Sequence, residues 1–227
     1  MNMPHLFFGV VEGDEVLFDE HETRHMKVVR VKPGDVVSVT DGLGGFYLCE
    51  VSTIGKRESR GKVLERREVI EKAKGELSVV VPHARWERMR FLVEKCVELG
   101  VDEIVVYRFE RSQMEHGMEK IEMVVRDAAK QCVRYVFPKL RRVDSLEEFV
   151  DENTLVLELG APTSLLEVPL ERECVRLVVG PEGGFSEREK EFLSKRTLFV
   201  SLGKKILRFE TAALLAVGYV ALKKGKI

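Results

Sequence analysis

The first seventy residues alternate between apolar and polar positions in short runs, a pattern typical of half-buried β-strands. Turn signals rich in glycine and aspartate separate the runs. The pattern predicts one helix over 22–31 and strands over 5–11, 15–18, 35–40, 45–51 and 62–65. Short strands at this spacing are typical of a small β-barrel.

From residue 76 the pattern changes to strands that alternate with helices. Continuous apolar runs predict strands over 76–82, 103–107, 154–157, 175–179 and 198–202. Apolar residues at helical spacing predict helices over 84–99, 118–136 and 209–223, and Ser186 with Glu189 forms a capping box for a short helix. Such alternation indicates a parallel-sheet α/β domain. We therefore expect two domains, over residues 1–72 and 73–227.

Composition excludes some classes of protein but names no partner. The chain has 227 residues, of which 44% are hydrophobic and 33% charged, so it is neither collagen, coiled coil nor a low-complexity chain. The net charge of −1 hides local patches: residues 54–74 carry eight basic and four acidic side chains, and residues 126–142 carry six and one. Lys130 and Arg134 lie on the second patch, which is either a solvated helix face or a phosphate contact.

Neither a membrane segment nor a metal site is expected. The longest apolar stretch, 211–222, is shorter than the ~20 residues of a membrane span, and no signal-peptide pattern opens the chain. We therefore expect a cytoplasmic protein. The four cysteines form no C-x-x-C pair and the five histidines have no ligand spacing, so we expect reduced, buried cysteines and no metal.

Two glycine-bearing turns follow predicted strands of the second domain. Gly180–Gly184 comes after the most apolar strand, and 202–208 follows the last one. Because ligands bind at the carboxyl ends of parallel strands, these turns predict a cleft of backbone amides, with apolar side chains at Leu202, Ile206 and Leu207. Such a cleft suits a neutral or zwitterionic ligand with an aromatic ring. Spacing alone leaves a second reading open, in which Gly180–Gly184 is only a tight turn and Arg208-Phe-Glu-Thr211 only a helix start.

Four segments, read together, resemble the RsmE family of ribosomal RNA methyltransferases in the SPOUT superfamily: 94–101 with 110–112, 127–134 with Pro138, 180–186 with Glu189, and 202–212. The resemblance implies a PUA-like, RNA-binding β-barrel over 1–72. It implies a SPOUT α/β domain over 73–227, whose C-terminal segment forms a deep trefoil knot. It further implies a homodimer that uses S-adenosylmethionine to methylate N3 of a uridine in 16S ribosomal RNA of the small subunit.

The resemblance also suggests roles for particular residues. The cofactor would contact Leu157, Leu159, Val179, Gly180, Pro181, Glu182, Gly183, Leu202, Gly203, Ile206 and Leu207. Arg208 and Arg134 would stabilise negative charge on the uridine oxygens, and Glu182 or Glu210 would accept or relay the N3 proton. RNA would be held by Arg24, His25, Arg30, Lys56, Arg60, Lys130 and Arg134. Two alternatives remain: a SPOUT methyltransferase that acts on tRNA, and a catalytically silent RNA-binding factor in ribosome assembly.

Overall fold

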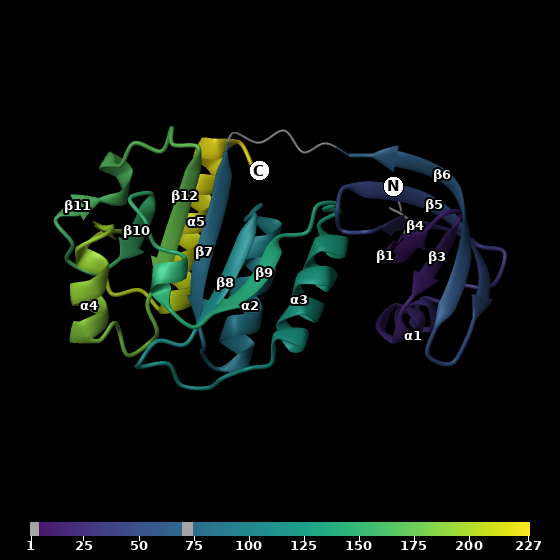
Figure 1. Ribbon diagram of the computed structural model, residues 1–227, viewed down its shortest axis with the longest axis horizontal. Coiled ribbons are helices and arrows are strands. Elements are labelled where there is room, and N and C mark those ends of the chain that lie inside the picture. Colours follow the sequence, from purple (N-terminus) through teal and green to yellow (C-terminus); the bar gives the residue numbers. More distant parts are fainter. Residues whose placement is uncertain (1–4, 70–74) are drawn as a thin grey trace. The chain divides into compact units, whose positions relative to one another are not determined.

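The computed structural model describes residues 5–69 and 75–227, and it divides into two compact units (Figure 1). Among the described residues, the first unit comprises 5–69 together with 126–137, and the second comprises 75–125 and 138–227. The segment 126–137 is therefore a part of the first unit that the predicted division into 1–72 and 73–227 does not include.

The first unit is a mixed sheet curved around an apolar core. Its strand order is β1-β4-β5-β6-β3-β2, with β1 and β4 parallel and the other neighbours antiparallel. Phe7, Phe18 and Met26 are fully buried in its centre. The elements are β1 Leu6–Phe8, β2 Val10–Glu12, β3 Glu15–Phe18, α1 Glu20–Val28, β4 Val36–Thr40, β5 Gly45–Ile54 and β6 Ser59–Glu68.

Helix α3 (Met118–Gln131) ends earlier than the sequence predicts. The chain leaves the helix through Val133, whose φ of +57° is left-handed, and the Arg134 N–H closes the turn on the Ala129 carbonyl at 2.8 Å. Residues 135–137 then extend along the first unit's sheet: the Phe137 N–H donates to Gly42 and the Tyr135 carbonyl accepts from Gly44. These long-range bonds replace the last helical turn that periodicity predicted.

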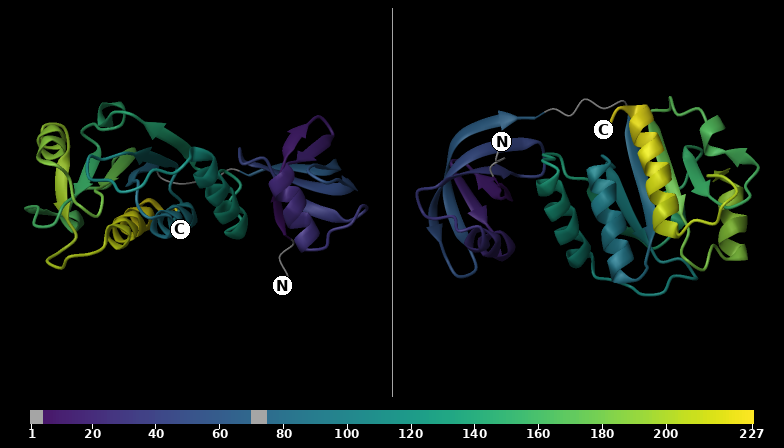
Figure 2. Two further views of the ribbon diagram at one scale, coloured as in Figure 1. Left: turned by 90° about the horizontal axis from the view of Figure 1, so that it is seen from below. Right: turned by 180° about the vertical axis from the view of Figure 1, so that it is seen from behind.

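The second unit is a parallel sheet of strand order β11-β13-β10-β12-β7-β8-β9. Helices α2 and α5 pack together on one of its faces (Figure 2). The strands are β7 Glu76–Pro82, β8 Glu103–Tyr107, β9 Lys139–Val143, β10 Thr154–Leu157, β11 Thr163–Ser164, β12 Cys174–Val179 and β13 Leu198–Ser201. The helices are α2 Trp86–Glu98, α4 Glu187–Ser194 and α5 Phe209–Lys224, with 3-10 turns at Leu146–Glu148 and Leu165–Glu167.

The predicted fold class, a barrel-like β unit followed by a parallel-sheet α/β unit, is confirmed. The capping box at Ser186 and Glu189 starts α4 as expected. The knot stays a prediction. Cys49 and Cys96 are buried, but Cys132 is exposed, so the expectation of buried cysteines is wrong there. None of the described helices has both the length and the apolar character needed to cross a membrane.

Candidate functional site

A cavity of about 560 Å³ lies at the carboxyl ends of β10, β12 and β13 in the second unit. These three strands are parallel neighbours, so the turns that follow them meet at one edge of the sheet, where open α/β sheets bind ligands. Ten of the eleven residues expected to contact the cofactor line the cavity: Leu157, Leu159, Val179, Gly180, Pro181, Glu182, Leu202, Gly203, Ile206 and Leu207.

The glycines of the two turns let backbone form the cavity wall. A Cβ at Gly180 would lie 3.0 Å from the Phe185 ring, and Gly203 has a φ of +129°, which side chains disfavour. Gly183, the eleventh expected residue, does not line the cavity. Its carbonyl accepts a hydrogen bond from Arg111 at 3.1 Å, so it anchors the turn to the loop after β8.

Charged and polar side chains from four parts of the second unit meet beside the cavity, and two of them, Arg88 and Glu182, line it. Glu182, in the turn after β12, accepts hydrogen bonds from Arg88 on α2 and, at 3.0 Å, from Gln113. The Arg88 Nε lies 3.9 Å from an oxygen of Glu210 on α5. Arg88 thus contacts both Glu182 and Glu210, the two carboxylates suggested as proton acceptors from the sequence. Arg88 is not identifiable from the sequence, because no local pattern links it to residues so distant along the chain.

Two residues at the start of α5, Glu210 and Arg208, have side chains that are available to bond a ligand. The Glu210 side chain is only 11% exposed, and its Oε2 atom has no hydrogen-bond partner among the described residues. Arg208 is the N-cap residue of α5, makes no side-chain capping bond and lines the cavity. A buried polar atom without a partner is costly, so Glu210 has capacity to bond a ligand.

Arg134, the fourth residue expected at the catalytic site, belongs to the first unit and is buried there. The second unit by itself therefore brings Arg208, Glu182 and Glu210 together, and it adds Arg88.

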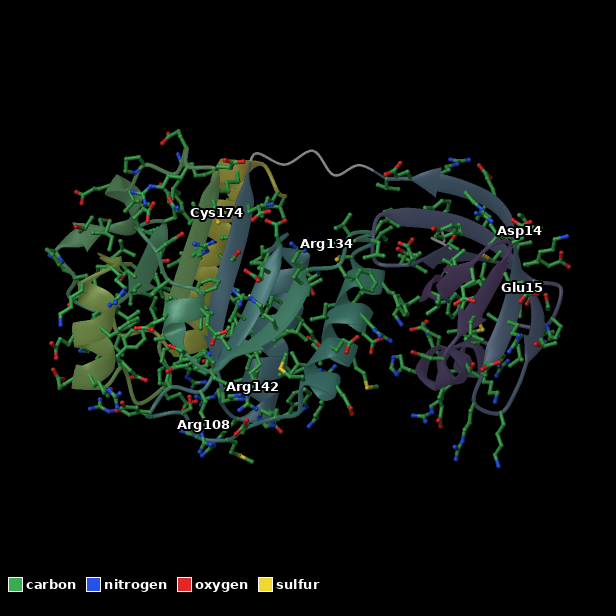
Figure 3. The ribbon with its side chains drawn as sticks, viewed as in Figure 1. Asp14, Glu15, Arg108, Arg134, Arg142 and Cys174 are labelled. Carbon is green, nitrogen blue, oxygen red and sulfur yellow. The ribbon has the colours of Figure 1, made fainter. Side chains whose placement is uncertain are left out.

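The basic stretch 126–142 is largely neutralised by ion pairs within the two units. In the first unit, Lys130 is buried against Glu22, a carboxylate that is only 1% exposed, and contacts Asp127 at 3.0 Å. The partners of Lys130 in the structure are thus carboxylates of the protein, whereas the prediction for Lys130 is a contact with an RNA phosphate. Other pairs are Arg126 with Asp19 at 3.0 Å, Arg141 with Glu103 at 2.7 Å, and Arg142, with Arg108, on Glu115. Figure 3 labels Arg108 and Arg142.

The other residues expected to bind RNA lie mainly on the surface of the first unit. Arg24, Arg30, Lys56 and Arg60 are exposed. Two of them have ion-pair partners: Arg24 contacts Glu20 at 3.2 Å and Arg60 contacts Glu58 at 2.8 Å. His25 is half-buried, and burial lowers the pKa of its imidazole, with the nearby Lys130 acting in the same direction.

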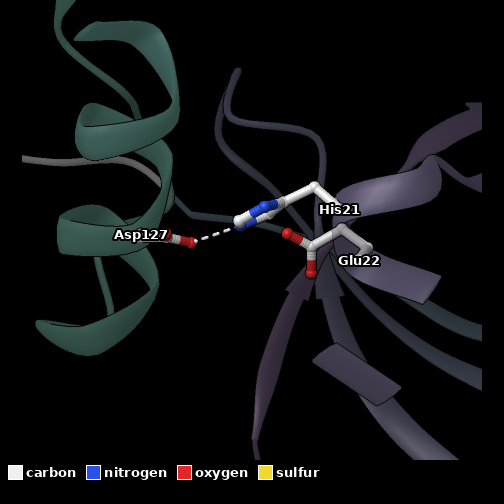
Figure 4. A group of neighbouring side chains, drawn as sticks. All are labelled: His21, Glu22 and Asp127. Carbon is white, nitrogen blue, oxygen red and sulfur yellow. Dashed lines mark hydrogen bonds and ion pairs between the residues drawn. The ribbon is translucent and has the colours of Figure 1, made fainter. Parts of the chain in front are cut away.

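His21, Glu22 and Asp127 bring three metal-type ligand atoms together in the first unit (Figure 4). The His21 ring bonds Asp127 at 2.9 Å, and the Lys130 ammonium contacts both carboxylates. Because this cation occupies the oxygens that a metal ion would use, the group is an ion-pair network.

Known proteins match both units. The chain matches the family models for the RNA methyltransferase domain over residues 71–221 and for the RNA methyltransferase PUA domain over residues 18–64. It is 29% identical to Ribosomal RNA small subunit methyltransferase E of Aquifex aeolicus, covering 92% of this chain and 95% of the relative.

Solved structures match the whole fold. A Thermotoga maritima chain described as a predicted RNA methyltransferase is 51% identical, with a TM-score of 0.88 and coverage of 99% of this chain and 100% of that one. A Ribosomal RNA small subunit methyltransferase E from Neisseria gonorrhoeae, bound to S-adenosyl methionine, is 25% identical with a TM-score of 0.81, and covers 98% of each chain.

The fold, the cavity and these matches define an RNA methyltransferase with an N-terminal PUA domain. Within that class, the chain belongs to the RsmE family.

Proposed function

We propose that the protein transfers a methyl group from S-adenosylmethionine to N3 of a specific uridine in 16S RNA of the small ribosomal subunit. The cavity at the carboxyl ends of β10, β12 and β13 carries the proposal. The family's small-subunit methyltransferases and the Neisseria structure with bound S-adenosyl methionine support the same donor and the same class of RNA.

The cavity lining fits the chemical groups of this cofactor. Leu157, Leu202 and Leu207 supply apolar surface for an adenine ring. Backbone at Gly180 and Gly203 can approach a ligand closely, because neither residue has a Cβ. The carboxylate of Glu182 lies at the rim as an ion pair with Arg88, and these two side chains can bond polar groups of the cofactor. When bound, the cofactor supplies an electrophilic methyl group.

Arg208 would stabilise the uridine during the reaction. Removal of the N3 proton leaves negative charge on the O2 and O4 atoms of the base, and a guanidinium beside them lowers the energy of that anion. We assign this role to Arg208, which lines the cavity and has no capping bond. We do not extend it to Arg134, because Arg134 is buried in the first unit.

Glu210 is the better candidate for the proton acceptor. Both oxygens of Glu182 already accept hydrogen bonds, one from Arg88 and one from Gln113. Glu210 keeps one oxygen without a hydrogen-bond partner among the described residues. A base must reach the proton with a free lone pair, so we assign the proton to Glu210 and an orienting role to Glu182.

We also propose that the enzyme acts in the cytoplasm as a homodimer. Helix α5 is apolar around its whole circumference, which is typical of a helix covered on all sides. One face of α5 is nevertheless exposed, with Leu215 at 52% and Leu222 at 67%, and Phe91 on the neighbouring α2 is also exposed. A second copy of the chain would cover these side chains.

Mass spectrometry of RNA nucleosides tests the reaction. The protein is incubated with S-adenosylmethionine and, separately, with unmodified small subunits, free 16S RNA and tRNA. The proposal expects 3-methyluridine at a single position of 16S RNA. If tRNA alone is methylated, the result favours the alternative in which the enzyme acts on tRNA. Calorimetry that shows no cofactor binding would favour the silent assembly factor.

Two variants test the assigned residues. Arg208→Ala and Glu210→Gln should each lower the single-turnover rate about 10²-fold or more, while calorimetry shows that the cofactor still binds. Arg196→Ala and Glu191→Gln change exposed residues of the second unit and serve as controls. If both site variants keep near-normal rates, the assignment is wrong.

A further inference from the structure

The first unit contains a cavity of its own, of about 740 Å³. It lies between the sheet, helix α1 and the segment that follows Asp127, all within that unit. Pockets of this size hold small organic ligands. No step of the methyl transfer uses it. Its lining residues are His5, Leu6, His21, Arg24, His25, Val28, Ser38, Phe46, Asp127, Lys130, Gln131, Val133 and Tyr135.

Flat rings form much of the wall of this cavity. Phe46 and Tyr135 pack edge to face with centroids 5.5 Å apart. His5 and His25 do the same at 6.0 Å. All four rings line the cavity, and they come from distant parts of the chain. Proteins that bind single-stranded RNA use such rings to stack unpaired bases.

The charges around the cavity favour a base over a phosphate. Lys130 is matched by Glu22 and Asp127, and Arg24 is matched by Glu20. The side chain of Asp127 is 52% exposed, and its contacts with Lys130 and His21 are both made by the Oδ1 atom. The same carboxylate can accept a hydrogen bond from the amino or imino group of a base. Gln131, which is exposed beside it, offers both a donor and an acceptor.

The backbone at the cavity wall is held in an unfavourable conformation. Val133 has a φ of +57°, which is rare for a β-branched residue. The backbone hydrogen bond from Arg134 to Ala129 spans this residue, and the bond from Phe137 to Gly42 holds the chain that follows it. This conformation places Val133 and Tyr135 on the cavity wall. Backbone strain of this kind is often found where a protein contacts a ligand.

We propose that this cavity accepts one unstacked base of the RNA substrate, from a nucleotide other than the methylated uridine. The inference rests on the proposed action on RNA and deepens it. The rings stack on the two faces of the base, and Asp127 and Gln131 bond its polar edge. The first unit then contributes to the choice of RNA through a base contact as well as through charge.

Fluorescence anisotropy with short RNAs tests the proposal on the full-length protein. The probes are fluorescein-labelled octamers of adenosine, cytidine or uridine and an octamer of abasic ribose phosphate. The octamers of adenosine and cytidine contain no uridine, so the methylation site cannot explain their binding. At least one base-containing octamer should bind about tenfold more tightly than the abasic octamer, as base stacking provides.

Tyr135→Leu should remove most of this preference and leave the affinity for the abasic octamer unchanged. Phe8→Leu is the matched control, since Phe8 packs on Phe137 of the same segment but does not line the cavity. His25→Ala repeats the test at a second ring of the cavity lining in case Tyr135→Leu does not fold. Circular dichroism and thermal unfolding monitor the fold of each variant, because the cofactor cavity lies in the second unit and does not report on the first.

Two results would overturn the proposal: equal binding of base-containing and abasic octamers by the unchanged protein, or equal weakening of both by Tyr135→Leu. Failure of the proposed methyl transfer is a separate result. In that case, 3-methyluridine would be absent from 16S RNA while the preference for bases persisted.

Discussion

Arg88 connects the two carboxylates of the candidate active site. Its guanidinium bonds Glu182 and lies 3.9 Å from Glu210, and it lines the cavity. Because all three side chains are largely covered, their mutual orientation depends on this cation. Arg88 is therefore a positioning residue, which acts on the reaction through Glu182 and Glu210.

Replacing Arg88 with methionine should lower the single-turnover methylation rate roughly 10²-fold, because Glu210 loses the group that orients it. Arg88→Lys keeps the positive charge but lacks the planar guanidinium with its several N–H donors, so it should restore only part of the rate. Arg90→Met, which removes an exposed ion pair with Glu94 on the same helix, is the control. Equal rates for Arg88→Met and Arg90→Met would show that Arg88 does not position the carboxylates.

Gly203 should be sensitive to a side chain. Its φ of +129° lies in a region that alanine disfavours by about 1–3 kcal/mol, so Gly203→Ala should shift the turn at the cavity wall and weaken cofactor binding about tenfold. Gly34, with a φ of +92° in the first unit, gives the matched control Gly34→Ala. Calorimetry measures both affinities, and the prediction fails if the two variants bind the cofactor alike.

His83 should make stability depend on pH. It is 1% exposed, and burial lowers the pKa of its imidazole from 6.5. The unfolded chain therefore takes up a proton below about pH 6.5, whereas the folded protein takes it up only at a lower pH. The free energy of unfolding should decrease as the pH falls below that value, by at most about 1.4 kcal/mol per pH unit from this group.

Urea unfolding at pH 7.5 and 5.5 measures this dependence. His83→Gln cannot be protonated, so it should lose part of the difference between the two pH values. His5→Gln, which changes an exposed histidine, should keep the difference. If His83→Gln and His5→Gln show the same difference in unfolding free energy between the two pH values, groups other than His83 cause the pH dependence.

At the scale of the elements, the second half of α3 is fixed to the first unit by a buried ion pair. Lys130 and Glu22 are both buried, and the Phe8 N–H also bonds Glu22 at 3.2 Å. Burial raises the pKa of the Glu22 carboxyl, and the attraction of Lys130 opposes this effect. The buried charge of each residue is therefore stabilised only while the other residue is present.

Lys130→Met should lower the free energy of unfolding by about 3–5 kcal/mol, because it leaves the Glu22 carboxylate buried without its cation. Adding Glu22→Gln should recover much of that loss. Arg24→Met removes an exposed pair with Glu20 and should change stability by about 1 kcal/mol or less. Chemical unfolding of the unchanged protein, Lys130→Met, the double variant and Arg24→Met measures these values. If Lys130→Met is as stable as Arg24→Met, the buried pair does not contribute as predicted.

At the scale of the whole molecule, the exposed face of α5 predicts self-association. The double variant Leu215→Lys and Leu222→Lys should convert a dimer into a monomer in sedimentation experiments, because each charge would be buried in the interface. Leu166→Lys changes a leucine that is also exposed but lies outside α5, and it should leave the dimer intact. A dimer that survives the double variant must use another surface.

The sequence determined the elements and the cavity in large part. Alternation of apolar and polar residues set the strands of the first unit, and continuous apolar runs set β7, β8, β10 and β12. The glycines at 180 and 203 marked the turns that form the cavity, because a requirement for backbone without a side chain is visible in the residue itself. These signals act over a few residues, so they can be recognised along the chain.

Only the tertiary structure decided which distant residues meet. It brought Arg88 to Glu182 and Glu210, ended α3 at Gln131 so that Tyr135 and Phe137 could bond the first unit, and buried Lys130 against Glu22. The sequence shows how many charges a segment carries, but the partner that neutralises each charge lies far along the chain. Burial and pairing energies depend on that partner, and only the folded chain specifies it.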